Sequence, residues 1–108
     1  MGRAQSNTDV FYAIADPTRR AIVDALGSGE QAASMLAGRF DCTFSAISQH
    51  MRILRDVGLV SVRSAGRERI YRLEAQSLAP VSDWVGRYDS FWQDKLAALG
   101  ELLEDENE

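Results

Sequence analysis

The residues best suited to chemistry lie close together in this chain, in the run CTFSAISQHMRILRD at positions 42–56. The run contains the only cysteine, Cys42, and the only histidine, His50, of the 108 residues. One thiol and one imidazole cannot supply the nucleophile, base and orienting group of an enzyme, or the soft ligands of a tetrahedral metal site. Since no glycine-rich phosphate loop follows a strand either, the sequence predicts no enzyme, no metal site and no cofactor.

The same run has the pattern of an amphipathic helix with one polar face. At about 100° per residue, Ile47, Met51 and Leu54 fall on one side, which we expect to be buried. The opposite side carries polar side chains, with Ser48 on its flank: Ser45, Gln49, Arg52 and Asp56. Because glutamine can pair with adenine in the major groove, this side is a candidate DNA-reading face with Gln49 as its base contact.

Several side chains of the run also have a structural interpretation. Thr43 and Ser45 are suited to phosphates at the helix start, but Thr43 and Ser48 could instead cap the helix. His50 lies at the border of the buried side, where it either contacts DNA or serves as a hydrogen-bonded structural residue. Cys42 is either structural or a redox-sensing thiol activated by the nearby helix start.

The elements that position this helix are predicted from breaks in the chain. Helices are expected over residues 8–15 and 17–26, because Asp16 can cap the second helix and Pro17 fits its first turn. A third helix is expected over residues 30–38, and Gly58 ends the fourth, polar-faced helix. Two such helices joined by a turn of about four residues form a helix-turn-helix.

A β-hairpin is predicted directly after it, in LVSVRSAGRERIYRLE at residues 59–74. Apolar residues alternate with polar ones on both sides of a turn at residues 64–67, as in a half-buried hairpin. Arginines gather on it: Arg63, Arg67 and Arg69, with Arg72 nearby. They are suited to phosphates or to a minor groove, although a hairpin tip is also an ordinary place for solvated charge. A hairpin after a helix-turn-helix predicts a winged helix.

Charge is unevenly distributed along the chain. The formal net charge is -4, but residues 41–73 hold six basic and three acidic side chains, whereas residues 74–108 hold two basic and nine acidic ones. DNA affinity depends on the local potential at the docking face, so the acidic total does not exclude DNA. No apolar run approaches the roughly 18 residues of a membrane span, and MGRAQS lacks the apolar core of a signal peptide, so we expect a cytoplasmic protein.

Residues 77–104 are predicted to form one last helix of about seven turns. Apolar and aromatic residues recur along it at helical spacing: Val81, Trp84, Val85, Tyr88, Phe91, Trp92, Leu96, Leu99 and Leu103. This apolar surface exceeds what a small winged-helix body can cover, so we expect it to pack on a partner chain, with packing inside one chain as the alternative.

Two segments resemble the ArsR/SmtB family of bacterial winged-helix transcriptional regulators: ADPTRRAIVDAL at residues 15–26 and FDCTFSAISQHMRILRDVGLVSVRSAGRERIYRL at residues 40–73. The resemblance covers residues 9 to about 104 and is nearest to a metal-site-lacking branch like the SdpR-type autorepressors. It implies a homodimer formed by the first and last helices, with Phe11, Ile14, Trp84, Tyr88, Phe91 and Trp92 as interface residues. It also places the thiolate pair of the arsenic-sensing type at Ala32 and Ser34, which cannot coordinate a metal.

The expected fold is therefore mainly α with a small β-hairpin, a winged helix-turn-helix with five helices and a two-stranded wing. We expect one domain over residues 1–108, with a winged-helix body at 8–74 and a dimerisation helix at 77–104. The expected function is a homodimeric repressor, possibly an autorepressor, on an inverted-repeat operator. The alternatives are a winged helix that binds protein and a regulator that responds to oxidation of Cys42. The DNA-binding residues expected are Thr43, Ser45, Ser48, Gln49, His50, Arg52, Arg63, Arg67 and Arg69.

Overall fold

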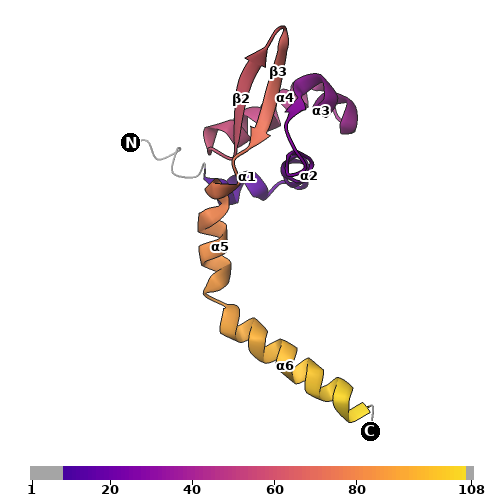
Figure 1. The fold of residues 1–108 in the computed structure, drawn as a ribbon, viewed down its shortest axis with the longest axis vertical. Coiled ribbons are helices and arrows are strands. Elements are labelled where there is room, and N and C mark those ends of the chain that lie inside the picture. Colours follow the sequence, from indigo (N-terminus) through magenta and orange to yellow (C-terminus); the bar gives the residue numbers. More distant parts are fainter. Residues whose placement is uncertain (1–8, 107–108) are drawn as a thin grey trace.

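The chain is divided into a small packed body and a long helical arm that leaves it (Figure 1). The computed structural model describes residues 9–106. The body contains α1 (Val10–Ile14), α2 (Pro17–Leu26), β1 (Gln31–Ala32), α3 (Ala33–Arg39), α4 (Phe44–Asp56), β2 (Val60–Ala65) and β3 (Glu68–Leu73). The arm contains a short 3-10 helix (Ala75–Leu78), α5 (Ala79–Gly86) and α6 (Asp89–Glu106). None of the helices in residues 9–106 is both long and apolar enough to span a membrane.

Capping residues set the helix ends of the body. Asp9 accepts a hydrogen bond from the backbone N–H of Tyr12 at the start of α1, and Asp16 accepts one from the backbone N–H of Arg19 at the start of α2. The second hydrogen bond holds the pKa of Asp16 below its ordinary value. Asp16 and Pro17 thus end α1 and begin α2, as predicted, while the predicted start of the first helix at Thr8 lies outside the described residues.

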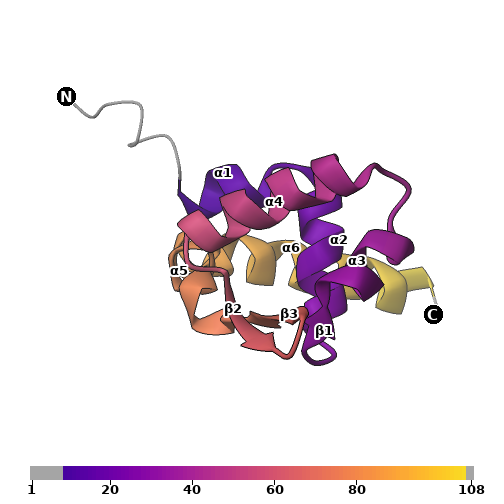
Figure 2. The ribbon, with the colours of Figure 1, turned by 90° about the horizontal axis from the view of Figure 1, so that it is seen from above.

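The helix-turn-helix is formed by α3 and α4, and α4 lies beside α1 across the body (Figure 2). The predicted inner side of α4 is confirmed, because Ile47, Met51 and Leu54 are buried. They join Leu36 of α3 and Ile22 of α2 in the core. The third helix begins at Ala33 rather than at residue 30, because residues 31–32 pair with β3 as a short strand.

The wing is confirmed as an antiparallel hairpin, to which β1 adds a third strand in the order β1-β3-β2. Val60 pairs with Leu73 and Val62 with Tyr71, so the predicted apolar alternation turns one face toward the core. The strands run closer to the tip than predicted, and only Gly66 and Arg67 form the turn. Gly66 has φ +65, a conformation favoured by glycine in two-residue hairpin turns.

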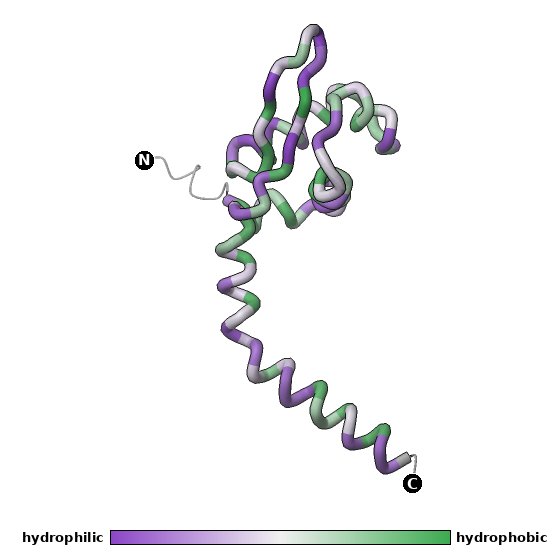
Figure 3. The backbone as a smooth tube through the Cα atoms, viewed as in Figure 1, coloured by the Kyte–Doolittle hydropathy of each residue, from purple (hydrophilic) through white to green (hydrophobic). Residues whose placement is uncertain are grey.

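The last helix was predicted as one element over residues 77–104, and this is wrong: α5 and α6 are separated at residues 87–88 (Figure 1). The part of the chain from residue 9 to 106 therefore has six α-helices instead of the expected five. The radius of gyration is 18.8 Å, against about 13 Å for a compact domain of this length. Green apolar positions recur along the whole arm in Figure 3, although the arm packs against little of its own chain beyond its first turns.

Candidate nucleic-acid interface

The face of α4 that points away from the core carries the predicted reading residues. Ser45, Ser48, Gln49 and Arg52 are all exposed, at positions one turn apart along the helix. Thr43 serves as the N-cap, since its hydroxyl oxygen accepts a hydrogen bond of 3.0 Å from the backbone N–H of Ala46. Thr43 therefore has the capping role that was the alternative to a phosphate contact, whereas Ser48 lies on the exposed face of the helix.

This face continues into a polar groove of about 360 Å³ between α4 and the wing. Its lining residues are Ser45, Ser48, Gln49, Arg52, Arg55, Arg69 and Tyr71. Three arginines thus line the groove beside the reading residues, an arrangement suited to the phosphates that flank a groove. Arg55 was not among the predicted site residues, although its position one helical turn after Arg52 is a signal that sequence reasoning could have used.

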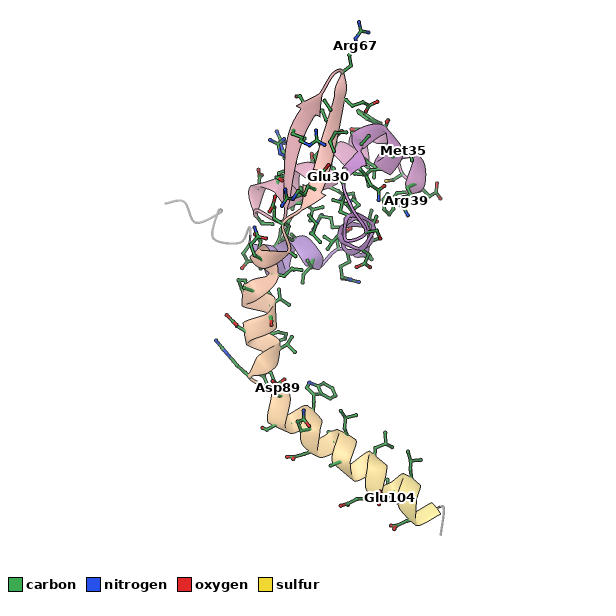
Figure 4. All side chains as sticks on the ribbon, in the orientation of Figure 1. Glu30, Met35, Arg39, Arg67, Asp89 and Glu104 are labelled. Carbon is green, nitrogen blue, oxygen red and sulfur yellow. The ribbon has the colours of Figure 1, made fainter. Side chains whose placement is uncertain are left out.

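The wing arginines, predicted as one cluster, are divided between two faces of the hairpin. Arg69 pairs with Ser64 and shares the face of Tyr71, with its guanidinium 5.9 Å from the centre of the Tyr71 ring. Arg63 pairs with Ile70 on the opposite face. At the tip, Arg67 extends away from the hairpin in Figure 4. Of these three arginines, Arg69 alone lines the groove beside the reading face.

Arg63, on the outer face of the hairpin, forms an ion pair. Arg63 Nη2 lies 2.8 Å from Oε1 of Glu30, just before β1. The hydrogen bond from Arg63 holds the pKa of Glu30 below its ordinary value, and the carboxylate raises the pKa of Arg63. Both side chains are well exposed, so the pair adds little stability, but it neutralises a charge that was expected to meet DNA.

His50 and Cys42 both lie partly inside the body. Nδ1 of His50 lies 3.2 Å from Nη1 of Arg19 on α2, so His50 is a hydrogen-bonded residue at the edge of the reading face. Cys42 is half-buried against the core, in the turn between α3 and α4. No group of three or more His, Cys, Asp or Glu side chains in the described range could hold a metal ion. Ala32 belongs to β1, and the Ser34 hydroxyl donates to Glu68.

The predicted interface residues form an aromatic surface where α1 meets the arm, which we define as Phe11, Trp84, Tyr88, Phe91 and Trp92. The Phe11 and Trp84 rings meet edge to face at 6.0 Å, and Trp84 and Tyr88 do so at 5.9 Å. Its arm residues and Val85 line an apolar cavity of about 380 Å³. All five side chains are exposed, whereas Ile14 packs partly against the core of its own chain. A monomer leaves this apolar surface open to water.

Comparison with known proteins gives consistent matches. A family model described as a helix-turn-helix domain matches residues 14–63. Along its full length the chain is 34% identical to the HTH-type transcriptional regulator Rv2034 of Mycobacterium tuberculosis, of which it covers 98%. It is 35% identical to the transcriptional repressor SdpR of Bacillus subtilis over 71% of this chain and 86% of that protein. A crystal structure of an ArsR family transcriptional regulator matches with a TM-score of 0.68 and 32% identity, over 77% of this chain and 91% of that one.

Proposed function

The chain belongs to the ArsR family of winged-helix transcriptional regulators, and from this premise we propose that it is a homodimeric repressor of an inverted-repeat operator. As a member of this family it is a DNA-binding transcriptional regulator and not an enzyme. Its dimeric state, its operator and the absence of a metal response are the parts that we propose. Since it acts on chromosomal DNA, we place it in the cytoplasm.

The observation that carries the proposal is the polar groove between α4 and the wing. The α4 face fits a major groove, where Gln49 would read a base and the serines would approach the backbone. Arg52, Arg55 and Arg69 would then meet the phosphates on either side, with Arg67 reaching further along the duplex. A surface that bound protein through apolar contacts would not need three arginines around a set of small polar side chains.

The aromatic surface supports the dimeric part of the proposal. Its side chains are about half exposed, and Phe11 links α1 to the arm through Trp84. A second copy that packs arm on arm would cover this surface in both protomers by a two-fold axis. Two reading helices related by that axis would meet an inverted repeat, with half-sites about one duplex turn apart. We therefore assign residues 9–74 to DNA binding and the arm to dimerisation within one domain.

We also propose that repression does not depend on a metal. The two positions that would carry the thiolate pair are Ala32 and Ser34, and a methyl and a hydroxyl group are poor ligands for soft metals. The arm has no histidine, so its carboxylates alone would have to supply a zinc site, and they point from an exposed helix. In the proposed mechanism, the dimer represses transcription solely by occupying the operator.

The test is a titration of the full chain against a duplex of its own upstream DNA and a scrambled duplex, followed by fluorescence anisotropy. We expect preference for the upstream duplex, a steep negative slope of log K against log salt, and no change with a chelator. Arg52→Gln should flatten the slope, whereas Arg87→Gln, the matched change of an exposed arginine on the arm, should leave it unchanged. A salt-independent contact would favour the protein-binding alternative, and a chelator effect would refute metal independence.

A further inference from the structure

Arg19 is a buried arginine where α1, α2 and α4 meet, with only 7% of its surface exposed. Because Pro17 prevents α1 from continuing, the carbonyl of Ala13 lacks a partner within the helix, and that of Tyr12 accepts only the backbone N–H of Ala15, at 3.2 Å. Arg19 donates to both carbonyls: its Nε to that of Ala13 at 2.7 Å, and its Nη2 to that of Tyr12 at 3.2 Å. The guanidinium also lies 5.3 Å from the centre of the Tyr12 ring. These contacts fix its orientation toward α4.

The third hydrogen bond of the Arg19 side chain determines which nitrogen of His50 carries the proton. Nη1 of Arg19 lies 3.2 Å from Nδ1 of His50. A guanidinium has five N–H donors and no acceptor, and it stays charged, so Nδ1 can only be the acceptor of this hydrogen bond. Nδ1 then bears a lone pair rather than a proton. The proton of the neutral ring must be on Nε2, for which residues 9–106 provide no hydrogen-bond partner.

Two ionisable groups of α2 lie near His50. Arg19 faces the ring, and Asp16, at the start of α2, accepts the hydrogen bond from the backbone N–H of Arg19 that lowers the pKa of its carboxyl. From α1 the neighbour is the uncharged Tyr12, through its contact with Arg19. The hydrogen bond from Arg19 needs the lone pair of Nδ1, so a proton on Nδ1 is incompatible with this contact. His50 itself is half-buried, between the exposed Gln49 and the buried Met51.

We propose that Arg19 is a positioning residue for DNA binding, which holds His50 in the Nε2–H tautomer so that His50 meets DNA as a hydrogen-bond donor. This inference rests on the proposed function. A donor at this place selects acceptors, either N7 and O6 of a purine edge or a phosphate oxygen, and rejects the amino group of cytosine. The same guanidinium holds the end of α1, the helix that contributes Phe11 to the aromatic surface.

The tautomer can be measured on the free protein. Because His50 is the only histidine, a long-range ¹H–¹⁵N correlation spectrum of the full chain reports its two ring nitrogens without assignment. We expect a protonated, pyrrole-type signal for Nε2 and an unprotonated, pyridine-type signal for Nδ1. Arg19→Lys, which keeps the charge but loses the fork of donors, should shift both signals toward a mixture of tautomers. A proton on Nδ1, or signals unchanged in Arg19→Lys, would overturn the assignment.

DNA affinity tests the consequence with a matched pair of variants. The amide of His50→Gln reaches the place of Nε2 and can offer an N–H donor there, whereas the shorter amide of His50→Asn reaches only the place of Nδ1, so that no donor remains near the place of Nε2. We expect His50→Asn to lose about five- to hundredfold in affinity for the upstream duplex, the range for one good groove contact, and His50→Gln to lose much less. Equal affinities of the two variants would contradict the donor role.

A double-mutant cycle of Arg19 and His50 distinguishes a positioning role of Arg19 from a role in the stability of the fold alone. Arg19→Lys should weaken DNA binding in the wild-type chain and have little effect in His50→Gln, where no ring remains to be oriented. An equal loss in both backgrounds would mean that Arg19 serves only the fold. Duplexes with 7-deazapurines, with 6-thioguanine or with methylphosphonate linkages weaken N7, O6 and the phosphate oxygens in turn, and one of them should abolish the difference between His50→Gln and His50→Asn; if none does, His50 does not donate to DNA. Failure of the wild type to prefer its duplex would reject the proposed function but not the tautomer.

Discussion

Removal of two rings from the aromatic surface should convert the protein into a monomer. Trp84 and Phe91 are 50% and 49% exposed, so about half of each side chain is available to a second copy. An aromatic side chain offers about 150–250 Å², which leaves about 100 Å² of each ring to be covered. Two rings on each of two protomers amount to about 400 Å², or at most about 10 kcal/mol at about 25 cal/mol per Å².

Even half of that free energy would raise the dissociation constant of the dimer by more than about three orders of magnitude. Trp84→Ala combined with Phe91→Ala should therefore sediment as a monomer at micromolar concentration, where we expect the wild type to sediment as a dimer. The fold of the body should survive, because the arm packs on little of it, and the far-ultraviolet circular dichroism checks this. Met35→Ala is the matched control, since Met35 is a large apolar residue 65% exposed on α3. A dimeric double variant would refute the interface.

Three further predictions concern the body of the protein. Gln49→Ala should cost about 1–3 kcal/mol on the specific duplex and little on random DNA by anisotropy, and equal losses would mean that Gln49 only positions the protein. Glu30→Gln should free Arg63 but leave DNA binding and its salt dependence nearly unchanged, because Arg63 lies on the face of the hairpin opposite Arg69; stronger binding with a steeper salt dependence would show that Arg63 reaches phosphates. Asp16→Asn should lower the free energy of unfolding at neutral pH. Because folding lowers the pKa of Asp16, its contribution is present above the unfolded value of about 3.9 and is lost as the pH falls through the folded value. Urea unfolding at several pH values should show the difference from wild type narrowing in acid, and a constant difference would argue against a carboxylate effect.

Much of the reading helix could be predicted because its signals are local. The buried side of α4 follows from the spacing of Ile47, Met51 and Leu54, and its start follows from a threonine placed before an apolar period. The junction at Asp16 and Pro17 likewise depends on neighbours within one turn. Sequence predicts local structure best at residues with few allowed backbone conformations or partners, such as a proline or a carboxylate that caps a helix.

The errors have longer-range causes. Helical spacing of apolar residues continues across residues 87–88, so nothing in that period reveals that α5 and α6 separate. The contact of Arg19 with His50 joins residues 31 positions apart and has no local signal. The division of the wing arginines was within reach, because strand parity places Arg63 and Arg69 on opposite faces once the turn is placed at Gly66 and Arg67. Because the turn was predicted over residues 64–67, the register between the two strands of the wing could not be assigned.

The separation of the basic segment at residues 41–73 from the acidic arm gives ionic strength two opposing effects. In the proposed dimer, two arms side by side would bring together two segments of net charge -7, from the two basic and nine acidic residues of 74–108, and at low salt this repulsion would weaken the dimer. At high salt the phosphate contacts of the body weaken instead. Operator occupancy should therefore pass through a maximum at an intermediate ionic strength, so that the charge pattern tunes the regulator to one range of internal salt.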